Sequence, residues 1–331
     1  ISLSGTPDGT ETLTILPTSS SIYDFVGNAA STSQSNSTVT LNDQRITMAI
    51  TAVNGSSSAV SDGSTTNDAT LTVTFTSSAT TTNFAVGDVT VSGGSLSSFS
   101  GTGTTYTATF TPTADGATTI DVAAGTFTDA SGYSNAAATQ FNWTYDGTSP
   151  YVAITATDGS NAVANNSTTN DATLSVTFTA NESVTGFAIG DIGTFGGSVS
   201  SFSGSGSSYT ATFTPSGERN TGIYLPKNTY TDIATNNNRG SLPFYWNYDA
   251  TAPTIVSGTS VASDNSTVTV KLSELVYDTN SGSGALEVGD FAFSISGGLG
   301  TLASATPTSI SKANPSFTDS QVATPDGPQS V

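Results

Sequence analysis

The sequence predicts an all-β protein made of tandem sandwich domains, and three observations carry that prediction. First, a ten-residue segment, NDATLTVTFT from Asn67, returns nearly unchanged as NDATLSVTFT from Asn170. Second, apolar residues alternate with threonine and serine in the repeated segments, which is the period of a half-buried β-strand. Third, the 33 glycines of the 331 residues are too frequent for helices of useful length.

The repeat has a period of 103 residues, which indicates tandem copies of one domain. Three further pairs of segments are separated by this distance: FAVGD from Phe84 and FAIGD from Phe187, YTATFTP from Tyr106 and from Tyr209, and WTYDGTSP from Trp143 and WNYDATAP from Trp246. We expect four parts: 1–43 as the C-terminal part of a repeat, 44–146 and 147–249 as complete repeats, and 250–331 as a partial or divergent repeat.

Each complete repeat contains a series of short amphipathic strands. In the first repeat their apolar residues are, in order, Leu71, Val73 and Phe75; Tyr106, Ala108 and Phe110; Ile120 and Val122; and Phe141, Trp143 and Tyr145. Clusters of glycine and serine, and Asn-Asp or Asp-Gly pairs, separate the strands at spacings of roughly 8–12 residues. About seven such strands in a unit of roughly 100 residues predict an immunoglobulin-like β-sandwich, and hence an elongated array of such domains.

The core of each sandwich is expected to consist of aromatic residues that recur in both repeats. We place Phe75, Phe84, Phe99, Phe110, Phe127 and Trp143 in the first core, and Phe178, Phe187, Phe202, Phe213, Tyr230 and Trp246 in the second. A tryptophan present at the same position of every repeat is expected in the core rather than on a sugar-binding surface.

The junctions between repeats carry a resemblance to a known family. Both have the pattern D-x-T-x-P, from Asp146 to Pro150 and from Asp249 to Pro253, and an apolar strand follows each. With these junctions and the YTATFTP strand, nearly the whole chain resembles the tandem bacterial-type immunoglobulin-like (Big) repeats of large secreted surface proteins and adhesins. The resemblance implies the sandwich fold, and it implies work as a stalk, a ligand-binding tip or a filament subunit.

The outer parts of the chain depart from this pattern. At the first junction, which begins at Asp43, Thr47 stands in place of the proline. In the last part, VTVKLSE takes the place of LTVTFT, which puts Lys271 where the complete repeats have an outward threonine. We interpret Lys271 as a surface lysine that protects an exposed strand. Glu182 and Glu274 have no counterpart one period earlier, so we assign them to a solvated loop or strand end.

Composition excludes several classes of function. Six Lys and Arg stand against 25 Asp and Glu, so the formal net charge is −19, and such a chain repels nucleic acids and anionic membrane surfaces. The absence of Cys and His removes disulfides, thiolate nucleophiles, imidazole triads and the usual zinc sites. No apolar run is long enough to span a membrane. We therefore predict a non-enzymatic protein that is secreted or attached to the cell surface.

Aspartates that recur with the period are the candidate ligands for a metal ion, and Ca²⁺ is the ion that we expect them to suit; no other cofactor is expected. These residues are Asp129, Asp146, Asp232 and Asp249. Calcium binds carboxylate, amide and backbone oxygens of the kind that these loops and junctions offer. The resemblance implies calcium that stiffens the array at its junctions. The alternative is that each aspartate only caps a turn of the backbone.

Glycans are a second expected modification if the source is a eukaryote. The pattern Asn-x-Ser/Thr gives exposed candidates at Asn36, Asn54, Asn165, Asn166, Asn181 and Asn265, and a further match at Asn142 lies inside a predicted strand. A chain this rich in Asn, Ser and Thr also produces such triplets by chance.

The predicted function is structural, as a repeat segment of a surface stalk or as a subunit of an extracellular filament. The two ends look like complementary parts of one fold, so head-to-tail sharing of that fold between copies is one hypothesis. The alternative is an adhesin or carbohydrate-binding module that recognises a cell-surface or glycan ligand through calcium or exposed aromatic residues. Its aromatic residues would be sought among Tyr224, Tyr230, Tyr245 and Tyr248.

Overall fold

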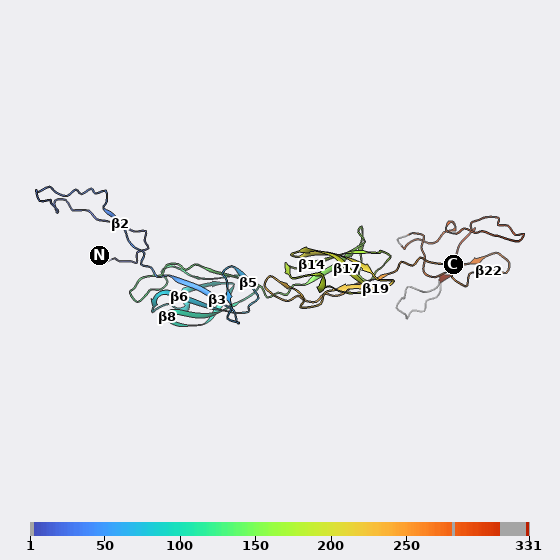
Figure 1. The fold of residues 1–331 in the computed structure, drawn as a ribbon, viewed down its shortest axis with the longest axis horizontal. Helices are drawn as coiled ribbons and strands as arrows, with labels where there is room; N and C mark the ends of the chain where they lie inside the picture. The colour runs from blue at the N-terminus through green and yellow to red at the C-terminus, as the bar shows by residue number, and fades with distance from the viewer. Residues whose placement is uncertain (1–2, 280–281, 312–328, 331) are drawn as a thin grey trace. The chain divides into compact units, whose positions relative to one another are not determined.

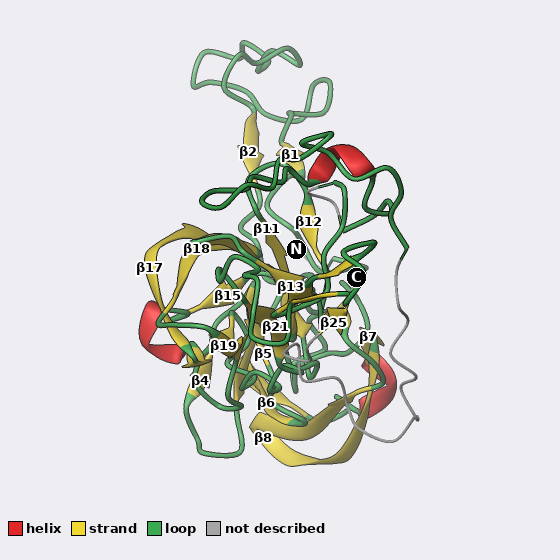
Figure 2. Cartoon of the chain, turned by 90° about the vertical axis from the view of Figure 1, so that its right-hand side faces the viewer, coloured by secondary structure: helices red, strands yellow, loops and turns green. Residues whose placement is uncertain are grey.

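A computed structural model describes residues 3–279, 282–311 and 329–330, and its regular structure is almost entirely β. The chain divides into two compact units after Tyr248. The first unit contains two β-sandwiches, marked by β3, β6 and β8 and by β14, β17 and β19 (Figure 1). The helices of the described residues are single turns among the strands (Figure 2), so none of them could span a membrane. The predicted fold, tandem immunoglobulin-like sandwiches, is confirmed.

The first sandwich consists of two four-stranded sheets. One has the order β4-β3-β6-β8, with β3 at Met48–Val53, β4 at Ala59–Val60, β6 at Leu71–Thr81 and β8 at Gly94–Pro112. The other has the order β5-β10-β9-β7, with β5 at Ser64–Thr66, β7 at Val89–Ser92, β9 at Gly116–Val122 and β10 at Phe141–Tyr145. Strands β5 and β10 are parallel, and the other neighbours are antiparallel.

The second sandwich repeats this arrangement. One sheet has the order β12-β11-β14-β18-β17, with β11 at Val152–Thr157, β12 at Ala162–Val163, β14 at Leu174–Ala180, β17 at Gly197–Ser205 and β18 at Ser208–Pro215. The other has the order β13-β21-β19-β16, with β13 at Thr168–Thr169, β16 at Gly193–Phe195, β19 at Arg219–Tyr224 and β21 at Phe244–Tyr248. A small pair joins β15, Val184–Thr185, to β20, Thr231–Asp232.

Outside the two sandwiches, the described residues form only short strand pairs. They are β1 (Thr12–Thr14) with β2 (Thr38–Thr40), β22 (Ser260–Val261) with β23 (Val268–Thr269), and β24 (Lys271–Leu272) with β25 (Gln329–Ser330). A bridge between Tyr23 and Ala29 closes a loop in the N-terminal segment, and similar bridges close the loops after Thr128 and Thr231. The division of the chain at 43, 146 and 249 stays a prediction.

The aspartate of the repeated FAVGD segment has a structural role. Each copy forms a single 3-10 turn: η1 at Val86–Asp88, η2 at Ile189–Asp191 and η3 at Val288–Asp290. In each turn the aspartate side chain accepts a hydrogen bond from the backbone N–H three residues earlier, at 2.7–2.8 Å. This contact satisfies a free donor at the start of the turn, which explains why the aspartate recurs.

The predicted cores are buried, with one exception in each sandwich. Trp143 and Trp246 are 2% and 0% exposed, and the other predicted aromatic residues are buried around them except Phe99 and Phe202, which are only partly buried. The preceding residues, Ser98 and Ser201, have φ values of 53° and 52°. This left-handed backbone marks an irregularity in the outer strand, so the following aromatic ring packs at the margin of the core.

The structure corrects the predicted alignment at two places. Ile46, not Thr47, takes the position of Pro150, because the carbonyl of Ile46 accepts from Ala136 N–H just as that of Pro150 accepts from Arg239 N–H. The first junction is therefore one residue shorter.

In the second compact unit, Ser273 takes the position of Asn181. Thr254 N–H donates to Ser273 Oγ as Tyr151 N–H donates to Asn181 Oδ1. Lys271 consequently lies two residues further along the strand than the sequence alignment placed it, at the position of Thr179. Glu274, one residue after Ser273, is the counterpart of Glu182.

Replacement of Tyr230 by phenylalanine is expected to stabilise the second sandwich by about 1 kcal/mol. The Tyr230 hydroxyl is buried without a hydrogen-bond partner, whereas the first sandwich has Phe127 at this position. Burial raises the pKa of Tyr230 to about 12 from 10.0. The hydroxyl of Tyr230 therefore loses its proton at lower pH in the unfolded chain than in the folded one, so the free energy of unfolding should fall as the pH rises from about 10 to 12. The phenylalanine variant has no hydroxyl and should not show this part of the pH dependence. Urea denaturation at pH 7 and pH 11 measures both effects, and a variant less stable at pH 7 would contradict them.

Candidate metal centre

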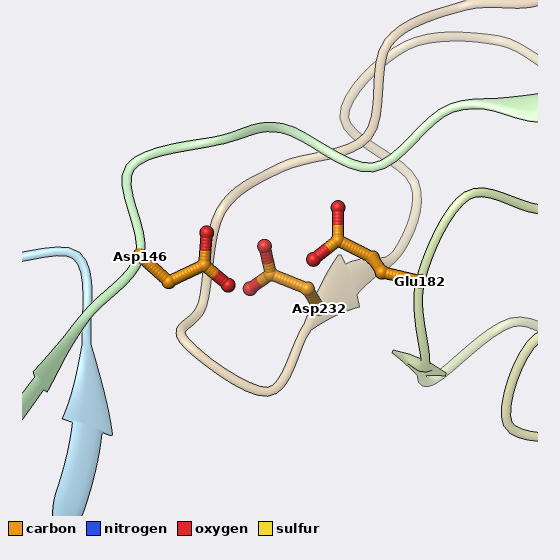
Figure 3. Close-up of side chains that lie close together, drawn as sticks. All are labelled: Asp146, Glu182 and Asp232. Atoms are coloured by element: carbon orange, nitrogen blue, oxygen red, sulfur yellow. The ribbon is translucent and has the colours of Figure 1, made fainter. Parts of the chain in front are cut away.

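Three carboxylates meet where the two sandwiches join. Asp146 directly follows β10, Glu182 lies between β14 and β15, and Asp232 ends β20. Each supplies one oxygen to a group whose members all lie within 4.8 Å of one another (Figure 3). Asp232 is 1% exposed, and the other two are half-buried. The predicted ligands Asp146 and Asp232 are thus brought together, with Glu182 beside them.

The loop after β20 fixes the position of Asp232. Its Oδ1 accepts a hydrogen bond from Asn236 N at 2.8 Å, and its Oδ2 accepts one from Asn236 Nδ2 at 2.9 Å. The same Nδ2 group donates to the backbone carbonyl of Asp146 at 2.7 Å. Asn67 of the first sandwich donates from Nδ2 to Asn236 Oδ1 at 3.1 Å. Asn236 therefore connects the loop, the junction and the preceding sandwich.

A second contact holds the junction from the first sandwich. Asp115, in the turn between β8 and β9, accepts hydrogen bonds from Gly147 N at 2.8 Å and from Thr148 Oγ1 at 2.5 Å. These bonds, first that from Thr148 and then that from Gly147, hold the pKa of Asp115 below its usual value. The backbone around Asp146 is therefore held by side chains of both sandwiches.

The electrostatics of the carboxylate group favour a bound cation. Burial is the largest cause of a raised pKa at Glu182. A hydrogen bond from Asn181 Nδ2 at 2.9 Å opposes that shift, and the charges of Asp146 and Asp232 add to it. No lysine or arginine contributes to the shift in the described part of the chain. Neighbouring negative charges raise the free energy of the ionised group, and a divalent cation would offset that cost.

The donor set suits calcium better than a transition metal. All three side chains offer hard carboxylate oxygens, and the chain contains neither a thiol nor an imidazole. Calcium takes six to eight such oxygens, including backbone carbonyls and water, in flexible geometries. A site built from Asp146, Glu182 and Asp232 leaves coordination positions for carbonyls or water.

Asp129 does not take part in an equivalent group. Its side chain accepts from the backbone N–H groups of Ser131 and Tyr133 at 2.8 and 2.9 Å, which is the turn-capping alternative. Ala79 stands at the position of Glu182 in this repeat. The counterpart of Asp146, Asp43, forms a 3.0 Å salt bridge with Arg45, so its charge already has a cationic partner.

Asp249 lies in the second compact unit. Its Oδ1 accepts from Thr251 N at 3.1 Å, the same contact that Asp146 makes with Thr148 N. Within residues 3–279 and 282–311, the group around Glu182 is the one place where three such ligands meet. The assignment of calcium to Asp249 stays a prediction.

The predicted acceptors for N-glycans lie on the surface. Asn36, Asn165, Asn166, Asn181 and Asn265 are exposed. Asn54 is half-buried, and its Oδ1 accepts from the N–H groups of Ser56 and Ser58. Accessibility is necessary for glycosylation but not sufficient, and glycosylation stays a prediction.

Comparisons with known proteins agree with the fold. The profile of a family described as bacterial Ig-like domain matches residues 48–145 and 146–243, which is more than half of the chain. No curated protein matches the chain.

Three solved structures resemble the chain at low sequence identity. The C-terminal domain of the Streptococcus agalactiae AgI/II polypeptide BspA is 8% identical, over 60% of this chain and 99% of that chain, with a TM-score of 0.31. Invasin, described as a bacterial integrin-binding protein, is 14% identical over 81% of this chain and 65% of that chain, with a TM-score of 0.34. The Yersinia pseudotuberculosis adhesin InvE is 13% identical over 62% of this chain and 58% of that chain, with a TM-score of 0.23.

Proposed function

The chain belongs to the bacterial Ig-like domain family, and from this we propose that it is a structural repeat segment of an extracellular surface protein. The observation that carries the proposal is the junction at Asp146. Two sandwiches that share several repeated segments follow each other through a few residues, and hydrogen bonds from both sides hold those residues. A stalk of defined length requires rigid junctions between its domains. In a flexible linker, the groups that form these hydrogen bonds would be solvated instead.

We further propose that calcium at Asp146, Glu182 and Asp232 stiffens this junction. Asp146 belongs to the junction, whereas Glu182 and Asp232 belong to the second sandwich. One ion bound by all three would therefore attach the junction to the second sandwich. The raised pKa of Glu182 supports the proposal, since burial and then the charges of Asp146 and Asp232 disfavour its ionised form, which a bound cation would stabilise. The first repeat, with Arg45 beside Asp43, would hold its junction without metal.

Assembly into a filament is the more specific form of the structural proposal. The segment 1–43 exposes Ile22, Phe25, Val26 and Val39 by at least 51% each. A groove of about 500 Å³ lies beside the β1–β2 pair, lined by apolar groups from Ile15 to Ile22 and by residues 34–39. Sheets of sandwiches are covered by a second sheet, and among the described residues no second sheet covers this pair. We propose that an Ig-like segment of another copy covers this face.

Electron microscopy of the purified chain tests the filament. Shared folding between copies predicts polymers with a regular subunit repeat, because a contact of this kind does not close on itself. Replacement of Ile22 and Val39 by aspartate is expected to abolish the polymers, while the two sandwiches stay folded by circular dichroism. Dispersed single chains at high concentration would exclude the filament and leave the structural repeat segment.

A further inference from the structure

Two aromatic side chains lie on the outer face of the second sheet of the second sandwich. Phe195 ends β16 and Tyr224 ends β19, and these antiparallel strands place Tyr224 opposite Gly193 and Phe195 opposite Gly222. Along β19 the alternate residues Thr221 and Ile223 are fully buried, so Tyr224 faces outward. Phe195 is 41% exposed and Tyr224 is 38% exposed, although both are large apolar groups.

Each ring lies across the glycine of the neighbouring strand. A Cβ atom at Gly193 would lie 2.4 Å from the Tyr224 ring, and one at Gly222 would lie 2.3 Å from the Phe195 ring. A Cβ atom at either glycine would therefore displace the ring above it, so the glycines let the two rings lie against the backbone while part of each ring stays exposed. Rings held in this way lose little conformational entropy when a ligand packs on them.

A third aromatic residue and two amides extend this surface. Gly222 is also opposite Tyr245 of β21, so Phe195, Gly222 and Tyr245 form one row across three strands. The next outward pair along the same strands is Asn220 and Asn247, which lie opposite each other. Their amides offer hydrogen-bond donors and acceptors beside the row. None of the outward residues named here carries a charge.

The first repeat has a different face at the same positions. Thr90, Ser92, Thr119 and Asp121 stand where the second repeat has Gly193, Phe195, Gly222 and Tyr224, and Asn142 stands in place of Tyr245. Ser92 and Thr119 share a hydrogen bond of 2.8 Å between their hydroxyls. Because the two sandwiches have the same architecture and nearly the same cores, the fold does not require the aromatic residues of the second.

We propose that this aromatic platform, Phe195, Tyr224 and Tyr245 with Asn220 and Asn247, binds a neutral carbohydrate polymer. The CH-lined face of a pyranose packs on a flat ring by dispersion, and its hydroxyl groups bond to amides. The net charge of −19 disfavours anionic polymers. Phe195 and Tyr224 are exposed on the outer face of a sheet, which suits a long chain better than a small ligand that needs an enclosed pocket. This binding site goes beyond the structural role and needs neither calcium nor polymerisation.

Titration of the whole chain with neutral oligosaccharides tests the proposal. The probes are cellohexaose, chitohexaose and mannohexaose, measured by calorimetry in a buffer that contains EGTA. At least one of them is expected to bind. The double variant Phe195→Ser with Tyr224→Asp, which restores the residues of the first repeat, should weaken that binding about tenfold or more. Tyr133→Ser removes an exposed tyrosine of the first repeat and is expected to leave the affinity unchanged.

A reverse graft keeps the test independent of damage to the second sandwich. Thr90→Gly, Ser92→Phe, Thr119→Gly and Asp121→Tyr, combined with Ala117→Asn, Asn142→Tyr and Thr144→Asn, rebuild the platform in the first repeat and should add a second binding site of similar affinity. Failure of all three probes to bind, or equal affinity in the double variant, would overturn the proposal. Sedimentation of the same variants detects an alternative partner: self-association that the double variant abolishes would assign the platform to a second copy of the chain and overturn carbohydrate binding.

Discussion

Replacement of Trp246 by alanine is expected to lower the free energy of unfolding of the second sandwich by about 3–5 kcal/mol. Its indole is fully buried, with the Phe213 ring at 4.7 Å and the Phe244 ring at 5.9 Å, so truncation leaves a large cavity between the sheets. The total free energy of unfolding of a domain is only about 5–15 kcal/mol. The second sandwich should therefore become marginal while the first stays folded.

Urea denaturation measures the effect, and the chain offers its own reporter. The two tryptophans lie one in each sandwich, so the fluorescence of the variant follows the first sandwich alone, and far-UV circular dichroism follows both. Phenylalanine variants are the matched controls. Trp143 Nε1 donates to Thr66 Oγ1 at 3.1 Å, whereas Trp246 Nε1 has no partner, so Trp246→Phe should cost less than Trp143→Phe. A loss below about 1 kcal/mol for the alanine variant would contradict the core assignment.

Calcium at about 100 times its Kd is expected to raise the free energy of unfolding of the second sandwich by about 2.7 kcal/mol. Only the folded chain brings the oxygens of Asp146, Glu182 and Asp232 together, so the ion stabilises that state alone. Scanning calorimetry in calcium and in EGTA measures the difference. The transition of the first sandwich should not move, because Arg45 already neutralises its junction aspartate.

The effect of Glu182→Gln on the free energy of unfolding should have opposite signs in EGTA and in calcium. In EGTA it is expected to be more stable than the parent chain, because the ionised Glu182 is partly buried beside two other carboxylates and the amide removes its charge. In calcium it should lose most of the metal-dependent gain. Asp129→Asn is the control, since an amide oxygen can still cap the turn and the residue lies outside the group. An unchanged calcium response in Glu182→Gln would exclude Glu182 as a ligand.

The fold could be predicted because the repeat and the strand period report long-range order directly. Alternation at Leu71, Val73 and Phe75 defines which face is buried, and the second copy confirms the period. The exact pairing could not be predicted, because one residue added or removed in a turn leaves the period elsewhere unchanged. This is how Thr47 was placed where the structure has Ile46. The partial burial of Phe99 had no signal either, since it depends on the left-handed backbone at Ser98.

The candidate sites were predicted in part. Asp146 and Asp232 are repeated residues of loops and were identified for that reason, whereas Glu182 was assigned to a solvated loop because the first repeat has no counterpart. Its role depends on a meeting of loops that are distant in sequence. Of the tyrosines that the sequence offers as candidates, Tyr224 and Tyr245 belong to the aromatic platform, whereas Tyr230 is buried in the core. Phe195 was not among the candidates. The alignment of the two repeats carried a signal for it, because Phe195 stands at the position of Ser92 and Gly222 at the position of Thr119.

Small-angle X-ray scattering of the purified chain, with calcium and with EGTA, tests most directly the claim that calcium stiffens the junction at Asp146. The scattering should show a narrow distribution of conformations in calcium and a broader one in EGTA, and the variant Glu182→Gln should give the broad distribution in both. Identical distributions in calcium and EGTA for the parent chain would contradict the account and leave the carboxylates as components of the turns in which they lie.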